Sequence, residues 1–133
     1  MTAIRHVLIG VATVVVAACY TGPSAASYAP AHDPAGAQVK LKLTKGSMRG
    51  ELLEVRDSAL VVWNGCHMSL VLFSAIEEAS FGGPDTYYEG GRPARESLLL
   101  MRMLSRFPGG MPKGVEADLL KCSGEAAPAV VSR

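Results

Sequence analysis

The apolar residues of this chain follow a period of two from residue 38 onward, which predicts a domain built mainly of β-strands. Valine and leucine alternate with lysine over residues 39–43, as in a strand that buries one of its faces. Further short strands are predicted over residues 48–56, 59–63, 68–73 and 76–81. We therefore expect five antiparallel strands within residues 38–81.

The turns and one glycine indicate that these strands form a bent sheet. Asn64 and Gly65 are a dipeptide that strongly favours a two-residue hairpin, and Asp57 with Ser58 supplies another turn. Gly50 lies inside the second strand, where glycine usually marks a bulge or a sharp bend. A strongly curved sheet or a small barrel is the expected result.

Two helices are predicted after the strands, which gives the α+β class. Pro93 stands where a helix favours proline, and the helical pattern continues to Phe107 before Pro-Gly-Gly ends it. A second, shorter helix is expected over residues 112–123. We expect both helices to pack on the barrel as a hairpin within residues 82–124, and residues 125–133 to fray.

Two groups of residues in this second half are candidates for a binding surface. The first helix carries a stripe of leucine and methionine, including Met101 and Phe107, that is too wide for a helix exposed to water. This stripe either packs within the domain or docks a partner. Tyr87 and Tyr88, in a Gly-rich loop, either form a binding spot or pack over the barrel mouth.

Part of the strand pattern resembles a known fold family. The sequence VKLKLTKG from Val39, followed by RGELLEVRDSALVV from Arg49, is similar to the first half of an Sm-like, SH3-type barrel. The resemblance implies a five-stranded barrel and little about function, since small barrels have many roles. The asparagine that binds RNA in such proteins is missing, and Glu77 and Glu78 stand where a basic residue and glycine would be.

The composition agrees with a small domain that does not bind nucleic acid. The 133 residues leave room for one domain. The net charge is only +1, and acidic and basic residues are interspersed, so no basic surface for a phosphate backbone is predicted.

The N-terminal segment has the organisation of an export signal. Arg5 and His6 precede an apolar run over residues 7–18, and small residues lead to Cys19. A transmembrane helix takes about 20 apolar residues, more than this run provides. Residues 1–18 are therefore predicted to be a cleaved signal peptide.

The end of this signal resembles the lipobox of bacterial lipoproteins. Val16, Ala17 and Ala18 provide a branched apolar residue and two small ones before Cys19. The resemblance implies cleavage before Cys19, a diacylglyceryl thioether on its sulfur and an acyl chain such as palmitate on the new amino group. The alternative is secretion after Ala18 without a lipid anchor.

The resemblance also implies a place in the cell envelope. Tyr20 stands where an aspartate would signal retention in the inner membrane, so in a diderm bacterium the periplasmic face of the outer membrane is implied. Residues 19–37 are rich in Ala, Pro, Ser and Gly, the composition of a flexible tether. His32 and Asp33 within it are expected to be solvated and not to bind a metal.

The two other cysteines, Cys66 and Cys122, form an even pair in a compartment that is oxidising, which favours a disulfide. The alternative is that Cys122 stays a free thiol, buried as a small apolar side chain on its helix.

No residue pattern predicts catalysis. Cys66 and His67 are neighbours along a strand and should point to opposite faces, and the same holds for Glu77 and Glu78. The chain contains no nucleophile elbow, phosphate-binding loop, dinucleotide fingerprint or HExxH sequence. We therefore predict a protein that is not an enzyme and uses no cofactor or metal.

The sequence thus favours a membrane-anchored envelope lipoprotein that serves as a binding or structural module, with an envelope protein as partner. A second hypothesis is an accessory lipoprotein that binds a small ligand or peptide through the Tyr87–Tyr88 loop and a groove beside the first helix. The third is a secreted protein of the same fold without a lipid anchor.

Overall fold

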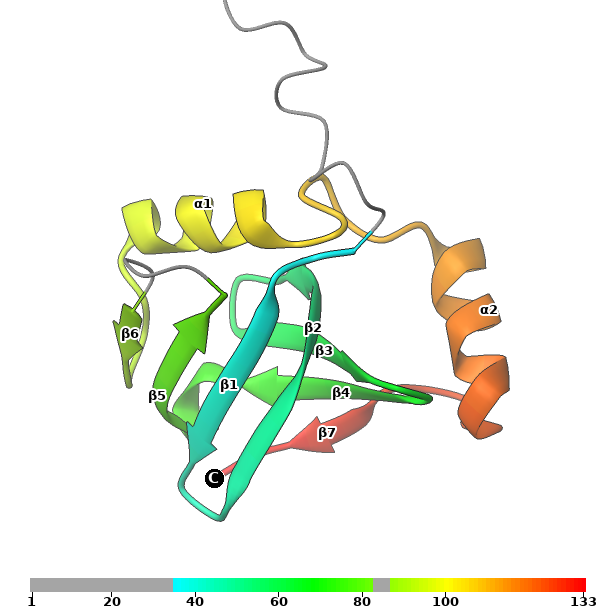
Figure 1. Ribbon diagram of the computed structural model, residues 1–133, viewed down its shortest axis with the longest axis horizontal. Helices are drawn as coiled ribbons and strands as arrows, with labels where there is room; N and C mark the ends of the chain where they lie inside the picture. The colour runs from blue at the N-terminus through cyan, green and yellow to red at the C-terminus, as the bar shows by residue number, and fades with distance from the viewer. Residues whose placement is uncertain (1–34, 83–86) are drawn as a thin grey trace, which may run out of the picture.

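A computed structural model describes residues 35–82 and 87–133 of the chain. Seven strands in this part form one sheet in the order β6-β5-β1-β2-β3-β4-β7 (Figure 1). Neighbouring strands are antiparallel except β4 and β7. The predicted α+β class, mainly β, is confirmed. The strands are β1 (Gln38–Leu43), β2 (Ser47–Val55), β3 (Ala59–Asn64), β4 (His67–Leu72), β5 (Ile76–Phe81), β6 (Tyr87–Glu89) and β7 (Ala129–Val131).

The chain connects these strands by short turns and by one pair of helices. A 3₁₀ turn, η2 (Phe73–Ala75), leads from β4 into β5. Helix α1 (Arg95–Leu104) follows β6, and α2 (Lys113–Ser123) precedes β7. All five predicted strands and both predicted helices therefore form, with differences at their ends.

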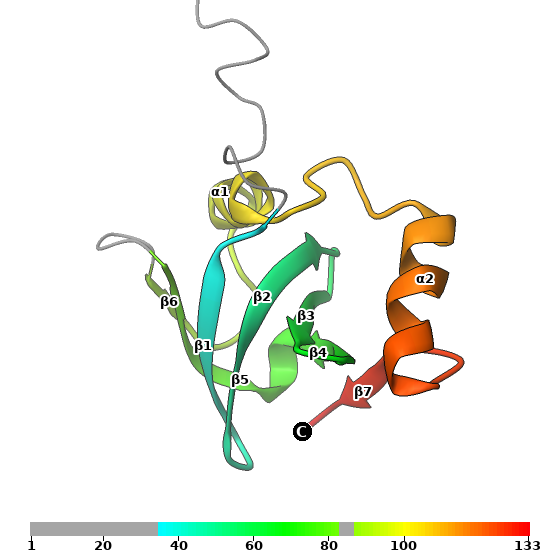
Figure 2. The same ribbon diagram turned by 45° about the vertical axis from the view of Figure 1, so that its right-hand side comes forward.

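The bend in β2 depends on Gly50. A Cβ atom at this position would lie 2.4 Å from the carbonyl oxygen of Trp63 on the neighbouring strand β3, so a side chain would force the two strands apart. Two residues further on, the register between β2 and β3 shifts between Leu52 and Glu54. The close approach and the shift of register both lie within β2, which Figure 2 shows as a curved strand.

The concave side of the sheet holds the larger apolar core. In β1 the buried residues alternate with exposed ones, which brings Val39, Leu41 and Leu43 into this core as predicted. Met101 of α1 closes the core from one end, where its side chain is only 2% exposed.

A second apolar cluster covers the opposite face of β2, β3 and β4. It consists of Leu53, Val61, Met68 and Leu120, with Phe107 packed against them. Because β3 contributes to both clusters, its residues are apolar in succession and do not alternate.

The two helices do not form the expected hairpin on one side of a barrel. Helix α1 contacts β2, whereas α2 contacts β4, and Figures 1 and 2 show them on different sides of the sheet. The connection between them explains the separation, because the N–H groups of Arg106 and Phe107 donate to the carbonyl oxygens of Leu52 and Leu53. The chain is thereby held along β2 while it crosses from one face of the sheet to the other.

The C-terminal residues, which we expected to fray, instead form an edge strand. Helix α2 ends at Gly124, which has the left-handed conformation that favours glycine. The chain then places β7 parallel to β4, with Leu70 opposite Val130. The free edge of β4 offers unpaired N–H and C=O groups, and hydrogen bonds to them stabilise β7. The sheet is therefore larger than the predicted five strands, with β6 and β7 at its two edges.

Several predicted features lie outside the described residues. These are the signal peptide with Val16, Ala17 and Ala18, the cysteine at position 19, and the tether up to residue 34. In the part of the chain that is described, neither helix has the length and apolar character needed to cross a membrane.

Candidate functional site

The structure joins Cys66 and Cys122 in a disulfide, with their Cα atoms 5.2 Å apart. Cys66 lies in the turn between β3 and β4, and Cys122 lies in the last turn of α2. The bond holds the end of α2 on the hairpin. Neither sulfur is then a thiol that could act as a nucleophile or bind a metal.

The neighbour of this cysteine, His67, is an exposed residue of β4. Its Nδ1 atom lies 3.9 Å from a carboxylate oxygen of Glu125. Within residues 35–82 and 87–133, no three His, Cys, Asp or Glu side chains gather in a way that could hold a metal ion.

The two glutamates of β5 are arranged differently from our expectation. We expected Glu77 and Glu78 to point to opposite faces, yet both carboxylates reach Lys42, at 3.5 Å and 3.2 Å from its Nζ. The reason is a register shift between β1 and β5, since Lys42 pairs with Glu78 and the next residue, Leu43, pairs with Ile76. The hydrogen bond from Lys42 to Glu78, with the charges of both carboxylates, raises the pKa of Lys42.

Of the residues proposed for a binding surface, three are placed in the cores. Tyr88 is only 7% exposed, and its ring packs edge to face on Phe73 with the centroids 5.9 Å apart. Its hydroxyl donates to the carbonyl oxygen of Gly91. Met101 is buried in the same core, and Phe107 is half-buried in the second cluster. The hypothesis of an exposed binding spot is therefore wrong for Tyr88, whose side chain packs within the domain as the alternative predicted. The side chain of Tyr87 lies outside the described part.

The exposed apolar face of α1 consists of other residues. Leu99, Leu100 and Met103 are 51%, 58% and 61% exposed. The sequence indicated that the apolar stripe of this helix is too wide for a helix exposed to water. It did not indicate which part of the stripe faces the core. Leu98, Met101 and Leu104 point to the core at a spacing of three, which leaves the neighbouring positions outside.

The point where the chain enters the domain is fixed by a buried ion pair. Arg106 donates two hydrogen bonds of 2.7 Å to the two carboxylate oxygens of Glu51, and the N–H of Gly36 donates to the same carboxylate at 2.6 Å. The N–H of Ala37 donates to the carbonyl oxygen of Leu104 at 2.8 Å. The first described residues are thus held at the C-terminal end of α1.

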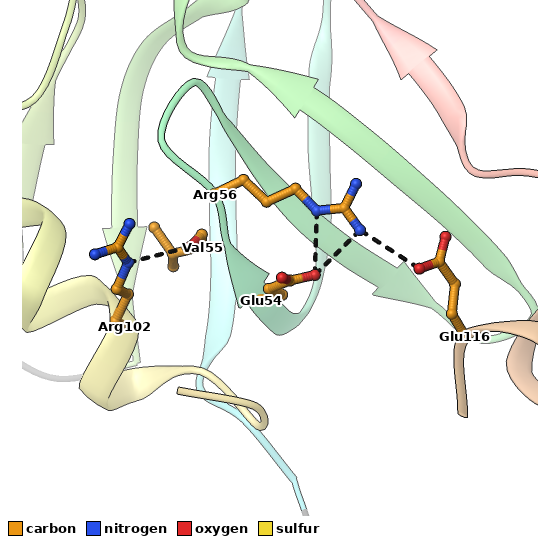
Figure 3. Close-up of polar contacts among 5 residues, drawn as sticks. All are labelled: Glu54, Val55, Arg56, Arg102 and Glu116. Atoms are coloured by element: carbon orange, nitrogen blue, oxygen red, sulfur yellow. Dashed lines mark hydrogen bonds and ion pairs between the residues drawn. The ribbon is translucent and has the colours of Figure 1, made fainter. Parts of the chain in front are cut away.

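A second polar cluster connects both helices to the end of β2 (Figure 3). Arg56 lies between Glu54 and Glu116, with nitrogen to oxygen distances of 3.1 Å and 3.5 Å. Arg102 of α1 donates to the carbonyl oxygen of Val55 at 3.3 Å. Arg102 also pairs with Asp57 at 2.7 Å, so each charged group named here has a partner of opposite charge.

A groove lies at one end of the sheet. Its volume is about 1030 Å³, and it lies between η2, the turn after β2 and the segment from β6 to α1. Both apolar and charged residues contribute to its lining. It is lined by Thr44, Asp57, Ser58, Leu72, Phe73, Ser74, Ile76, Glu77, Gly90, Gly91, Arg92 and Arg133.

Comparison of the chain with protein-family models, with curated proteins and with solved structures gave no match.

Proposed function

We propose that the protein is an exported lipoprotein whose domain is held at a membrane by acyl chains on Cys19. The observation that carries this proposal is the sequence Val16-Ala-Ala-Cys19 at the end of a short apolar run. Several acyl chains on one residue give a stable anchor, whereas a single chain binds only marginally. In a diderm bacterium the anchored domain faces the periplasm from the outer membrane.

The entry point of the domain supports a tethered arrangement. Gly36 and Ala37 are held by β2, by α1 and by the carboxylate of Glu51. A load from an anchor at Cys19 would reach the fold first through these hydrogen bonds.

We propose further that the domain acts by binding or supporting other envelope components and not by catalysis. The residues that the sequence offered as candidates for catalysis have other contacts in the structure. Cys66 is in a disulfide, and Glu77 and Glu78 both pair with Lys42. The partner we expect is an envelope protein. In-cell crosslinking of the anchored protein tests this, and repeated failure to capture any envelope protein would contradict it.

Metabolic labelling with an alkyne-bearing palmitate analogue tests the lipid anchor. We expect the label on the wild type and on Cys66→Ser, which keeps the cysteine at position 19. We expect no label on Cys19→Ser. A label that persists in Cys19→Ser would contradict the proposal, and so would its absence from the wild type.

We also propose that β1 to β5 form a five-stranded barrel of the SH3 type. The support is the order β5-β1-β2-β3-β4, the 3₁₀ turn between β4 and β5, and the bend of β2 at Gly50. An experimental structure in which β2 is straight would contradict it.

A second candidate function is the binding of a small ligand or peptide in the groove beside β6 and α1. Its volume is near the upper limit of the range of ligand sites, and its lining combines the apolar residues Leu72, Phe73 and Ile76 with the charged Arg92. The anionic apolar dye anilinonaphthalene sulfonate is a suitable probe. We expect saturable binding that weakens in Arg92→Gln and persists in Arg95→Gln, and equal binding by both variants would contradict the role of the groove.

A further inference from the structure

Helix α1 has apolar residues on an exposed face in addition to those that pack in the core. Leu98, Met101 and Leu104 fill the core, while Leu99, Leu100 and Met103 remain at least half exposed. Residues three and four positions apart are neighbours on a helix surface, so these three exposed side chains form one patch. We call this patch, Leu99, Leu100 and Met103, the outer face of α1.

The chain enters the domain at the end of this same helix. Ala37 donates to the carbonyl oxygen of Leu104, one residue beyond Met103, and Figure 1 shows β1 beginning beside the C-terminal end of α1. Only residues 20–35 separate Cys19 from Gly36. A chain of that length spans at most roughly 60 Å even when fully extended. Because the chain enters at the C-terminal end of α1, an acyl anchor on Cys19 would hold this end of the helix within that distance of the lipid surface.

We infer that the outer face of α1 rests on the lipid bilayer to which the protein is anchored. This inference rests on the proposed lipoprotein function and names the surface that the anchored domain turns to the membrane. An amphipathic helix with its apolar side in the interface is a recognised mode of membrane contact. Arg92 and Arg95 are exposed before and at the start of α1 and outnumber Glu96, which favours anionic headgroups.

A second copy of the chain is a less suitable occupant of this face. Stable interfaces bury roughly 800 Å² on each partner, which three partly exposed side chains do not supply. A membrane contact needs less, because the tether already holds the helix at high effective concentration near the bilayer. A contact too weak to bind the free domain is therefore sufficient for the anchored one.

The test uses the lipidated protein in vesicles that contain anionic lipid. Under the proposal Cys19 is a thioether and Cys66 is bonded to Cys122, so an introduced cysteine is the only free thiol. A nitroxide on Met103→Cys reports on the outer face of α1. A nitroxide on Lys45→Cys, in the exposed β1–β2 turn at the far end of the domain, is the matched control.

We expect collisions of the Met103→Cys label with a water-soluble nickel reagent to fall about tenfold on anchoring, since leucine and methionine prefer apolar surroundings by at least that factor. Collisions of the Lys45→Cys label should not change. Adding Leu99→Ser and Leu100→Ser to the labelled protein should restore the collisions at position 103 while the acyl mass stays the same.

Three results would overturn the inference in different ways. A protein without acyl mass would remove the lipoprotein proposal and this inference together. A protein with acyl mass whose label at position 103 stays exposed would remove the inference alone. Shielding that grows with the ratio of protein to lipid would show that a second copy, and not the bilayer, covers the face.

Discussion

Removing one partner of the buried ion pair between Glu51 and Arg106 should destabilise this domain strongly. The side chain of Glu51 is only 9% exposed, and its carboxylate accepts from Gly36 and twice from Arg106. Glu51→Gln keeps the shape and removes the charge. The amide NH₂ group of the glutamine is a donor and replaces one of the two oxygens that accept from Arg106. The guanidinium, also a donor, then has no negatively charged partner.

The expected cost follows from the burial of the pair. Breaking a buried pair costs about 3–5 kcal/mol, and because Arg106 keeps some access to water we expect the lower end, about 3 kcal/mol. With a urea dependence of roughly 1.5 kcal/mol per M, the midpoint of unfolding should fall by about 2 M. Equilibrium urea unfolding followed by circular dichroism measures this.

Asp57→Asn is the matched control. The nitrogen to oxygen distance between Arg102 and Asp57 is 2.7 Å, the same as between Arg106 and Glu51. The side chain of Asp57, however, is 92% exposed. An exposed pair contributes less than about 1 kcal/mol, so this variant should shift the midpoint only slightly. Equal shifts in Glu51→Gln and Asp57→Asn would refute the reasoning, because burial would then not decide the strength of the pair.

Three further predictions follow from other parts of the fold. Cys66→Ser opens a loop of sequence separation 56 and should lower the free energy of unfolding by about 4 kcal/mol in thermal unfolding; reductant should change the wild type but not the variant. Gly50→Ala should cost at least about 3 kcal/mol, whereas Gly114→Ala, which has open space around its Cβ, should change the urea midpoint little or raise it. Burial raises the pKa of the Tyr88 phenol above its ordinary value of 10.0, so the folded state resists ionisation and stability should be lost as pH rises above that value. Tyr88→Phe should reduce this loss in urea midpoints compared from about pH 9 to pH 11, while Lys42, whose pKa is also raised, keeps a slope of the same sign. A slope as steep as that of the wild type would contradict the assignment.

The five strands β1 to β5 could be predicted because their burial is visible in their sequences. In β1 the alternation of Val39, Leu41 and Leu43 with lysines corresponds to one buried and one exposed face. In β3 the apolar residues are consecutive because both faces are covered, and the turn signals on either side gave its limits. The bend of β2 was predictable from Gly50 for the same reason, since only glycine allows the close approach of β3.

The arrangement of the helices could not be predicted from their apolar residues. Periodicity shows that Met101 and Phe107 are apolar positions, but it does not say that they enter different clusters on opposite faces of the sheet. That separation depends on hydrogen bonds from Arg106 and Phe107 to β2, more than fifty positions away in the chain. Contacts between such distant segments leave no local pattern.

Two smaller features were missed because they depend on the backbone alone. Strand β7 has three residues, too few for a period to be visible, and it forms because the edge of β4 is available. The convergence of Glu77 and Glu78 on Lys42 depends on one shift of register that strict alternation does not include. The candidate surface on α1 could be predicted as a helix, and only the fold decided which of its sides is exposed.

Intact mass combined with flotation of membranes tests the lipid anchor most directly. Wild-type protein and Cys19→Ala are expressed with their full N-terminal sequence, and both are weighed and separated on a density gradient. We expect the wild type to carry acyl mass on a chain that begins at Cys19 and to float with the membranes, and the variant to do neither. Two soluble proteins without added mass would contradict the account and would leave an ordinary secreted domain.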